Sequence, residues 1–233
     1  MLHVTQTALR PFSHARVEAW VVDTSQFLAR SYTDYFTALD IYAKDLMPIC
    51  EAVHRWAAKY DCNADRDLKQ LSCLAISLGH RFWQDPRFGH YVVSSIENRD
   101  MPRPQAVQSL VAQSTEWLGA LWQDDTVQEF GERLCALILG GYPATSVNLK
   151  YVLPGHALMF SQSDEDLLLL WLGTRLPQTQ YDHQRLSYIC MALAFGTGWW
   201  KDPQYRNIAH AVSAHNTPED LVNRILPMFR ALP

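Results

Sequence analysis

A run of basic and aromatic side chains in the first half of the sequence is the strongest candidate for a binding surface. Its basic members are His80, Arg81, Arg87, His90, Arg99 and Arg103, with Phe82, Trp83, Phe88 and Tyr91 placed among them. Arginine and large aromatic residues are enriched at protein–protein hot spots. We expect a partner protein to be bound through five of these side chains: Arg81, Arg87, His90, Arg99 and Arg103. A solvated helix edge and stacking on single-stranded nucleic acid are the alternatives for this run.

The spacings that mark known catalytic and metal sites are missing from the chain. Glu51 and His54 have the Glu-x-x-His spacing of di-iron helical bundles, but those bundles need two copies and two more glutamates. His210 and His215 are five residues apart, which does not match the i, i+4 geometry of a zinc pair. Gly-x-Ser-x-Gly, Ser-x-x-Lys and glycine-rich phosphate loops do not occur. The sequence therefore predicts no catalytic residue, no metal and no cofactor.

Composition narrows the class of protein further. The 233 residues are 48% hydrophobic and 19% charged, with a formal net charge of −4, so a disordered chain and a binder of duplex nucleic acid are excluded. Five cysteines, an odd number without Cys-x-x-Cys spacing, indicate buried reduced thiols and a cytoplasmic protein. No secretory signal and no apolar run of membrane-spanning length is visible.

The most informative pattern is an internal repeat. The first segment, Cys73–Phe88, aligns without a gap to the second segment, Cys190–Tyr205, at an offset of 117 residues. Six of the 16 aligned positions are identical, where chance gives about one, and five more exchange one apolar or aromatic residue for another. The offset is half the chain length. We therefore expect two related halves, residues 1–116 with a repeat core at 65–100 and residues 117–233 with a repeat core at 180–216.

Within the repeat, six residues have expected structural roles: Trp83, Asp85, Pro86, Trp200, Asp202 and Pro203. An aspartate before a proline is a typical helix start, with the carboxylate as cap and the proline at the first helical position. The tryptophan two residues earlier is placed to wedge the corner between successive helices. The competing interpretation makes each aspartate a general base or a ligand.

Helical periodicity dominates the chain, and no strand-length alternation of apolar and polar residues is found. We predict an all-α protein of about ten helices, in two related halves stacked into one body. The expected ranges are 15–31, 33–59 with a kink at Pro48, 65–83, 86–97, 104–122, 126–139, 164–176, 180–198, 203–214 and 218–231. Residues 140–163 are expected to form an irregular connector.

These features favour a non-enzymatic cytoplasmic protein that binds another protein, as an adaptor, a secretion chaperone or a toxin-neutralising immunity protein. The alternative is an enzyme or ligand binder with an apolar pocket between helices and polar groups such as His80, Asp85, His156 and Asp202. The tryptophans without a repeat partner are the places to search for an aromatic binding surface: Trp20, Trp56, Trp117, Trp122 and Trp171.

Overall fold

The protein is all-α, as predicted. The computed structural model describes residues 6–123, 125–144, 149–155 and 162–232, and every regular element in these ranges is a helix. The α-helices are α1 (Gln6–Ser31), α2 (Thr33–Ala38), α3 (Ala43–Ala57), α4 (Asp65–Ser77), α5 (Gly89–Ser94), α6 (Arg103–Trp122), α7 (Val127–Leu139), α8 (Leu149–Val152), α10 (Gln162–Gly173), α11 (Asp182–Phe195), α12 (Arg206–Ala214) and α13 (Pro218–Ala231). Short 3-10 turns are η1 (Ala58–Tyr60), η2 (Phe82–Gln84), η3 (Trp199–Lys201) and η4 (Pro203–Tyr205).

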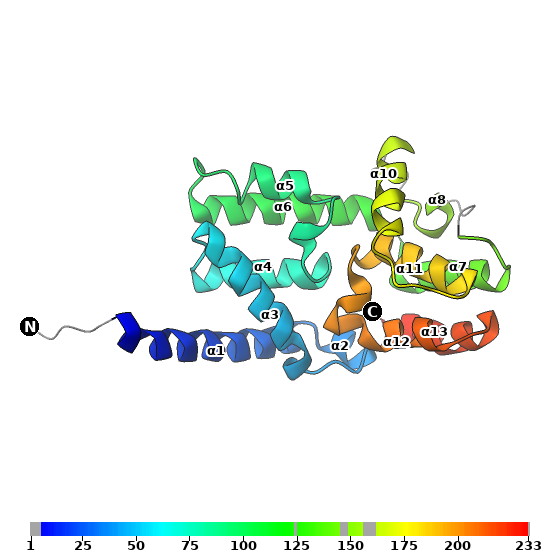
Figure 1. Cartoon of the computed structure of the whole chain (residues 1–233), viewed down its shortest axis with the longest axis horizontal. Coiled ribbons are helices and arrows are strands. Elements are labelled where there is room, and N and C mark those ends of the chain that lie inside the picture. Colours follow the sequence, from blue (N-terminus) through cyan, green and yellow to red (C-terminus); the bar gives the residue numbers. More distant parts are fainter. Residues whose placement is uncertain (1–5, 124, 145–148, 156–161, 233) are drawn as a thin grey trace, which may run out of the picture.

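The helices form two groups that share one hydrophobic core. Figure 1 shows α1, α3, α4, α5 and α6 on one side and α7, α11, α12 and α13 on the other. Buried apolar side chains from Val21 to Leu232 belong to one continuous cluster. The turn after α2 reaches the second group, where the Asn207 side chain donates a 2.9 Å hydrogen bond to the Leu39 carbonyl. The Tyr35 and Tyr205 hydroxyls join the groups again at 2.8 Å.

Capping residues explain where several helices begin. Thr217 caps the start of α13, because its hydroxyl accepts from the Asp220 backbone N–H at 3.2 Å. Thr126 and Glu129 form a reciprocal capping box at the start of α7. Among the helices of the described chain, none is long and apolar enough to cross a lipid bilayer. The five cysteines are free, and four of them are buried.

Several predicted boundaries are wrong, and backbone with positive φ accounts for three of them. The helix expected over 33–59 is broken at residues 39–42, where Asp40 has a φ of 55°, and Pro48 lies inside α3. The helices expected to reach residues 83 and 198 end earlier because Gly79 and Gly196 have φ values of 97° and 104°. The helix expected from residue 86 begins only at Gly89. Of the expected connector 140–163, residues 145–148 and 156–161 lie outside the described ranges, while α8 and the start of α10 occupy part of the remainder.

The two repeat segments meet at their glycines. A Cβ atom added at Gly196 would lie 2.6 Å from the Leu78 carbonyl oxygen, and one added at Gly79 would clash even more closely with the Phe195 carbonyl oxygen. The two glycines are 117 residues apart, so equivalent positions of the repeat touch one another. The contact therefore confirms a structural role for the aligned glycines. The wider division into residues 1–116 and 117–233 stays a prediction.

Alanine at either glycine should destabilise the fold strongly. Gly79→Ala and Gly196→Ala each combine a positive φ with a backbone clash, and we expect each to lower the free energy of unfolding by about 2–3 kcal/mol or more. Gly119→Ala is the matched control, because Gly119 lies inside α6 with no atom within 4 Å of an added Cβ. That variant should gain about 0.5–1 kcal/mol. Denaturant unfolding measures all three, and equal stabilities would contradict the close approach.

Candidate functional site

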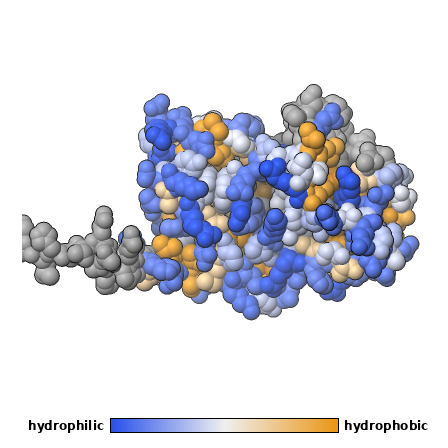
Figure 2. Space-filling model, viewed as in Figure 1, coloured by the Kyte–Doolittle hydropathy of each residue, from blue (hydrophilic) through white to orange (hydrophobic). Residues whose placement is uncertain are grey.

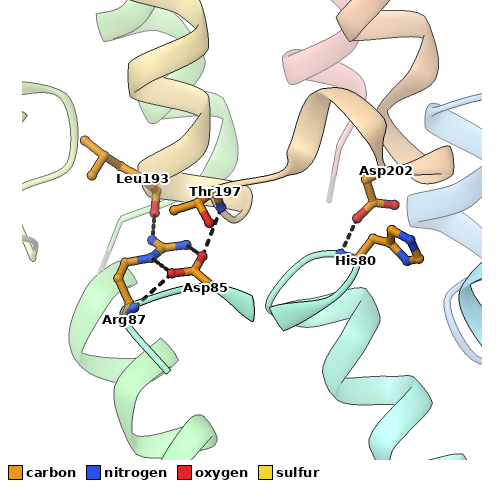
Figure 3. A network of polar contacts seen from close by, with 6 residues as sticks. All are labelled: His80, Asp85, Arg87, Leu193, Thr197 and Asp202. Atoms are coloured by element: carbon orange, nitrogen blue, oxygen red, sulfur yellow. Dashed lines mark hydrogen bonds and ion pairs between the residues drawn. The ribbon is translucent and has the colours of Figure 1, made fainter. Parts of the chain in front are cut away.

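Two buried aspartates hold the repeat segments together, since each accepts a hydrogen bond from the backbone of the opposite segment (Figure 3). Asp85 accepts from the Thr197 backbone N–H at 2.9 Å, and Asp202 accepts from the His80 backbone N–H at 2.5 Å. Thr197 is the repeat equivalent of His80, and Asp202 is the equivalent of Asp85. Each aspartate thus bonds the same backbone position of the opposite segment. We call these contacts, with those of residues 87 and 204, the inter-segment lock.

The same aspartates also organise their own segments. The second oxygen of Asp85 accepts from the Arg87 backbone N–H at 3.0 Å, and that of Asp202 accepts from Gln204 at 3.1 Å. The cap at Asp202 with Pro203 at the first position of η4 is therefore as predicted. Pro86 lies instead in a turn before α5, so Asp85 caps that turn. Both carboxylates are committed to backbone amides, which removes them as candidate acids for catalysis.

Positions 87 and 204 complete the lock with different chemistry. Arg87 pairs with Asp85 at 2.7 Å and donates to the Leu193 carbonyl at 2.7 Å, as Figure 3 shows. Gln204 donates to Asp202 at 3.0 Å and to the Ile76 carbonyl at 3.2 Å. Leu193 and Ile76 are again 117 residues apart. The geometry of the two halves of the lock matches, but only the Asp85 half contains a compensating cation.

The missing cation leaves Asp202 as a buried carboxylate held by neutral donors. Its side chain is 1% exposed. Loss of hydration raises the pKa of Asp202 to about 6, although the hydrogen bonds from Gln204 and His80 act in the opposite direction. The protonated form is thus stabilised in the folded chain, since burial penalises a charge that no arginine offsets.

The repeat tryptophans depart from the expected corner wedge. The fully buried rings are those of the preceding residues, Phe82 and Trp199, and the Trp199 indole donates to the Tyr188 carbonyl at 3.1 Å. Trp83 is half-buried and stacks on Trp56 at 4.6 Å. Trp200 is also half-buried and lies at the rim of two pockets. The residue that fills the second corner is therefore Trp199.

A cleft of about 690 Å³ opens beside the lock, between the two repeat segments. The first segment contributes residues that include His80, Arg81 and Phe82, and the second contributes residues 196–198, Trp200 and Lys201. Trp171, Thr174 and Arg175 close a further side from the end of α10 and the turn after it. Cationic and aromatic side chains gather in this cleft, and we treat it as the candidate site.

The cleft is electropositive. Arg81, Arg175 and Lys201 are exposed cations on its lining, and among the described lining residues the only acidic one is Asp85, which is 4% exposed and paired with Arg87. Burial, aided by the positive charges of Arg81 and Arg55, lowers the pKa of His80 to about 4. His80 is therefore neutral near pH 7, and its Nδ1 atom is buried without a hydrogen-bond partner.

Aromatic and apolar groups adjoin these cations. The Arg175 guanidinium lies 4.2 Å from the centre of the Trp171 ring, a cation–π contact that fixes its position. On α10 the Leu170 side chain is 68% exposed, and Figure 2 shows a hydrophobic patch over this helix. Exposed arginines, half-buried tryptophans and an apolar patch therefore adjoin one another at the cleft.

The five residues predicted to bind a partner do not lie together in the structure. Arg81 lines the cleft. Arg87 is 6% exposed and its guanidinium is used within the lock, so it is not available to a partner and we leave it out of the proposed surface. Arg103 donates to the Ile96 carbonyl at 2.8 Å, while His90 and Arg99 are exposed outside the cleft lining. Binding by these three stays a prediction.

Sequence reasoning did not single out Arg175 or Lys201. Lys201 lies in the repeat but differs from its equivalent Gln84, and Arg175 follows Trp171 by one helical turn. Trp171 was expected only as one of several unmatched tryptophans. Of the polar groups proposed for an enzymatic pocket, His156 lies outside the described residues. No group of three metal-ligating side chains is present in the part of the chain that the structure describes.

Comparison with known proteins gave no match: no family model, curated protein or solved structure resembles the chain.

Removing the charge of Arg87 should destabilise the lock. Arg87→Met leaves Asp85 buried without a cation, and we expect a loss of about 3–5 kcal/mol in the free energy of unfolding. Arg87→Gln installs the residue found at position 204 and should lose less. The control Arg230→Gln breaks an exposed pair with Glu132 and should change stability by at most about 0.5 kcal/mol. If Arg87→Met unfolds at the same denaturant concentration as Arg230→Gln, the ion pair has no stabilising role.

His80 and Asp202 should impose opposite pH dependences on stability. The folded-state pKa of Asp202 is raised from 3.8 to about 6, so its contribution falls as pH rises through this range. The folded-state pKa of His80 is lowered from 6.5 to about 4, so its contribution rises over nearly the same range. His80→Asn removes the second effect and keeps the backbone N–H. The change in unfolding free energy from about pH 4.5 to about pH 6.5 should therefore be more negative in this variant than in the parent. An unchanged difference would contradict the assignment of His80.

Proposed function

We propose that this protein acts by binding a partner protein in the cleft between its repeat segments. The observation that carries the proposal is the concentration of exposed Arg81, Arg175 and Lys201 with the Trp171 and Trp200 rings in one concavity. Arginine and tryptophan dominate protein hot spots because they combine large contact area with directional bonds. The exposed Leu170 beside the cleft extends the surface with apolar contact area.

The hydrogen-bonded lock beside the cleft supports binding over catalysis. Asp85, Asp202, Arg87 and Gln204 satisfy one another and opposing backbone groups, so they hold the two walls at a fixed separation. A preformed surface lowers the entropic cost of association. The lock does not present a free acid or base to a substrate. A non-enzymatic role as an adaptor, a secretion chaperone or a neutralising immunity protein follows from this proposal, and the free cysteines favour the cytoplasm as its location.

A small-molecule enzyme is less well supported. The volume of about 690 Å³ suits a small ligand, but such pockets are lined predominantly by apolar groups with a few convergent polar ones. Here the polar lining is mainly exposed cations, and the two buried aspartates already accept backbone hydrogen bonds.

Site-specific cross-linking tests the proposal. A photo-reactive amino acid replaces Gln84, an exposed lining residue, and in a second protein it replaces Arg99, which is exposed but does not line the cleft. Both are incubated with extract of the native cell, and the cross-linked protein is identified, purified and mixed with the parent chain. We expect one partner that cross-links from position 84 far more than from position 99 and forms a stoichiometric complex in sedimentation. A chain that stays monomeric in extract, or equal cross-linking from both positions, would contradict partner binding at the cleft.

A further inference from the structure

We infer that the occupant of the cleft is a short acidic segment of the partner protein, whose carboxylates pair with Arg81, Arg175 and Lys201. This inference rests on the proposed function and specifies its chemistry. The three cations come from three separate places in the chain: Arg81 from the first segment, Lys201 from the second, and Arg175 from the turn after α10. Their convergence on one concavity places positive charge on three sides of any occupant.

The cations of the cleft form no ion pair with an acidic side chain of the described residues, which is also true of exposed arginines such as Arg99 and Arg185. Lys69, Arg133, Arg206 and Arg230 each pair with an aspartate or glutamate. Among the ion pairs of the described residues, none involves Arg81, Arg175 or Lys201. In a chain of net charge −4, three unpaired cations in one cleft create a local field opposite in sign to the whole molecule. A partner carboxylate supplies the missing charge.

Arg81 is held at a backbone conformation that an arginine adopts at a cost. Its φ of 63° and ψ of 37° lie in the left-handed region, which glycine occupies freely and other residues do not. The equivalent residue of the second segment is Gly198, which has a φ of −128°, so the left-handed backbone is particular to Arg81. Strain of this kind clusters at functional sites. The local backbone would favour glycine at position 81, so the side chain there is best explained by what its guanidinium binds.

Arg175 is prepared for a planar ligand by its stacking on Trp171 at 4.2 Å. A stacked guanidinium loses less conformational freedom when it pairs with a carboxylate, and its fork of N–H donors matches the two carboxylate oxygens. The cleft of about 690 Å³ has room for a few side chains and excludes a folded domain. These features fit an extended peptide segment.

A carboxylate segment fits better than single-stranded nucleic acid, although both are anionic. A protein that binds a polynucleotide needs basic residues along a groove that follows the phosphate backbone, and a single pocket does not provide such a groove. The cations of the cleft account for three of the chain's 20 lysines and arginines, and the molecule as a whole carries net negative charge. The net negative charge of the molecule therefore disfavours a long phosphate backbone, whereas a short acidic segment of a protein can end within the cleft.

Fluorescence anisotropy with defined probes tests this inference on the full chain. The probes are a fluorescein-labelled peptide of alternating Glu and Gly, the same peptide with Lys in place of Glu, and a labelled oligothymidylate of equal length. The binding variant is Arg81→Gly with Lys201→Gln, in which each cation becomes the residue of the equivalent repeat position. The control is Arg224→Gln, which removes an exposed cation of α13 outside the cleft.

We expect the Glu peptide to bind the parent and the control equally, with affinity that falls as salt rises, and to bind the double variant about tenfold or more weakly. The melting temperature of the double variant should not fall, because Arg81→Gly relieves a left-handed backbone. This separates loss of the binding side chains from loss of the fold.

Three results would overturn the inference: no salt-sensitive binding of the Glu peptide, equal binding to the parent and the double variant, or tighter binding of oligothymidylate than of the peptide. These results are distinct from failure of the proposed function. A partner that cross-links from position 84 while the Glu peptide does not bind would retain the cleft as a protein-binding site and reject its acidic occupant. Binding of the Glu peptide without any recovered partner would retain the chemistry of the cleft and reject the proposed function.

Discussion

The close approach of Gly79 and Gly196 is the constraint on which the rest of the structure depends. Each glycine has a positive φ, and each lies where an added Cβ would strike the carbonyl of the residue before the other. This approach brings the backbone N–H groups of His80 and Thr197 within reach of the opposite aspartate. Without two glycines the segments would stand further apart, and neither carboxylate would bridge them. The helix ends at Ser77 and Phe195, the lock and the adjoining cleft all follow from one pair of residues without side chains.

The lock also shows how a symmetric arrangement tolerates unequal chemistry. Asp85 and Asp202 accept equivalent hydrogen bonds, yet one faces an arginine and the other a glutamine. A buried carboxylate needs either a cation or enough hydrogen-bond donors to offset lost hydration. Asp85 has both, whereas Asp202 has donors only, and its raised pKa is the consequence. Contacts to the opposite carbonyls are kept in both halves, because Arg87 and Gln204 each reach one with a side-chain N–H. The hydrogen-bond geometry is thus the same in both halves of the lock, whereas the charge at positions 87 and 204 differs.

The sequence identified the segments that matter because identical residue types recur where backbone geometry requires them. The aligned glycines and aspartates mark the contact between segments, and helical periodicity identified the all-α fold. Three features of the site depend on contacts between residues far apart in the sequence. Pairing of Asp85 with Thr197 joins residues 112 positions apart, and no spacing rule reveals it. Arg87, which the sequence predicts to contact a partner protein, is buried for the same reason, since the Leu193 carbonyl that it bonds lies in the other segment. Arg175 belongs to neither segment, so its place in the cleft required the packing of α10.

The differences between the segments are as informative as their similarities. Repeat contacts build the lock and leave a concavity beside it. Two of the three cations that line this concavity, Arg81 and Lys201, stand at positions where the segments differ, since their repeat equivalents are Gly198 and Gln84. A residue needed for packing is constrained by its contacts in both copies, as the glycines and aspartates are. A residue exposed in a cleft is free of that constraint, so its identity reflects what the cleft meets. The positive charge therefore lies on those positions that the lock does not fix, which is the arrangement expected when the repeat provides the frame and its exposed, unmatched residues provide the recognition.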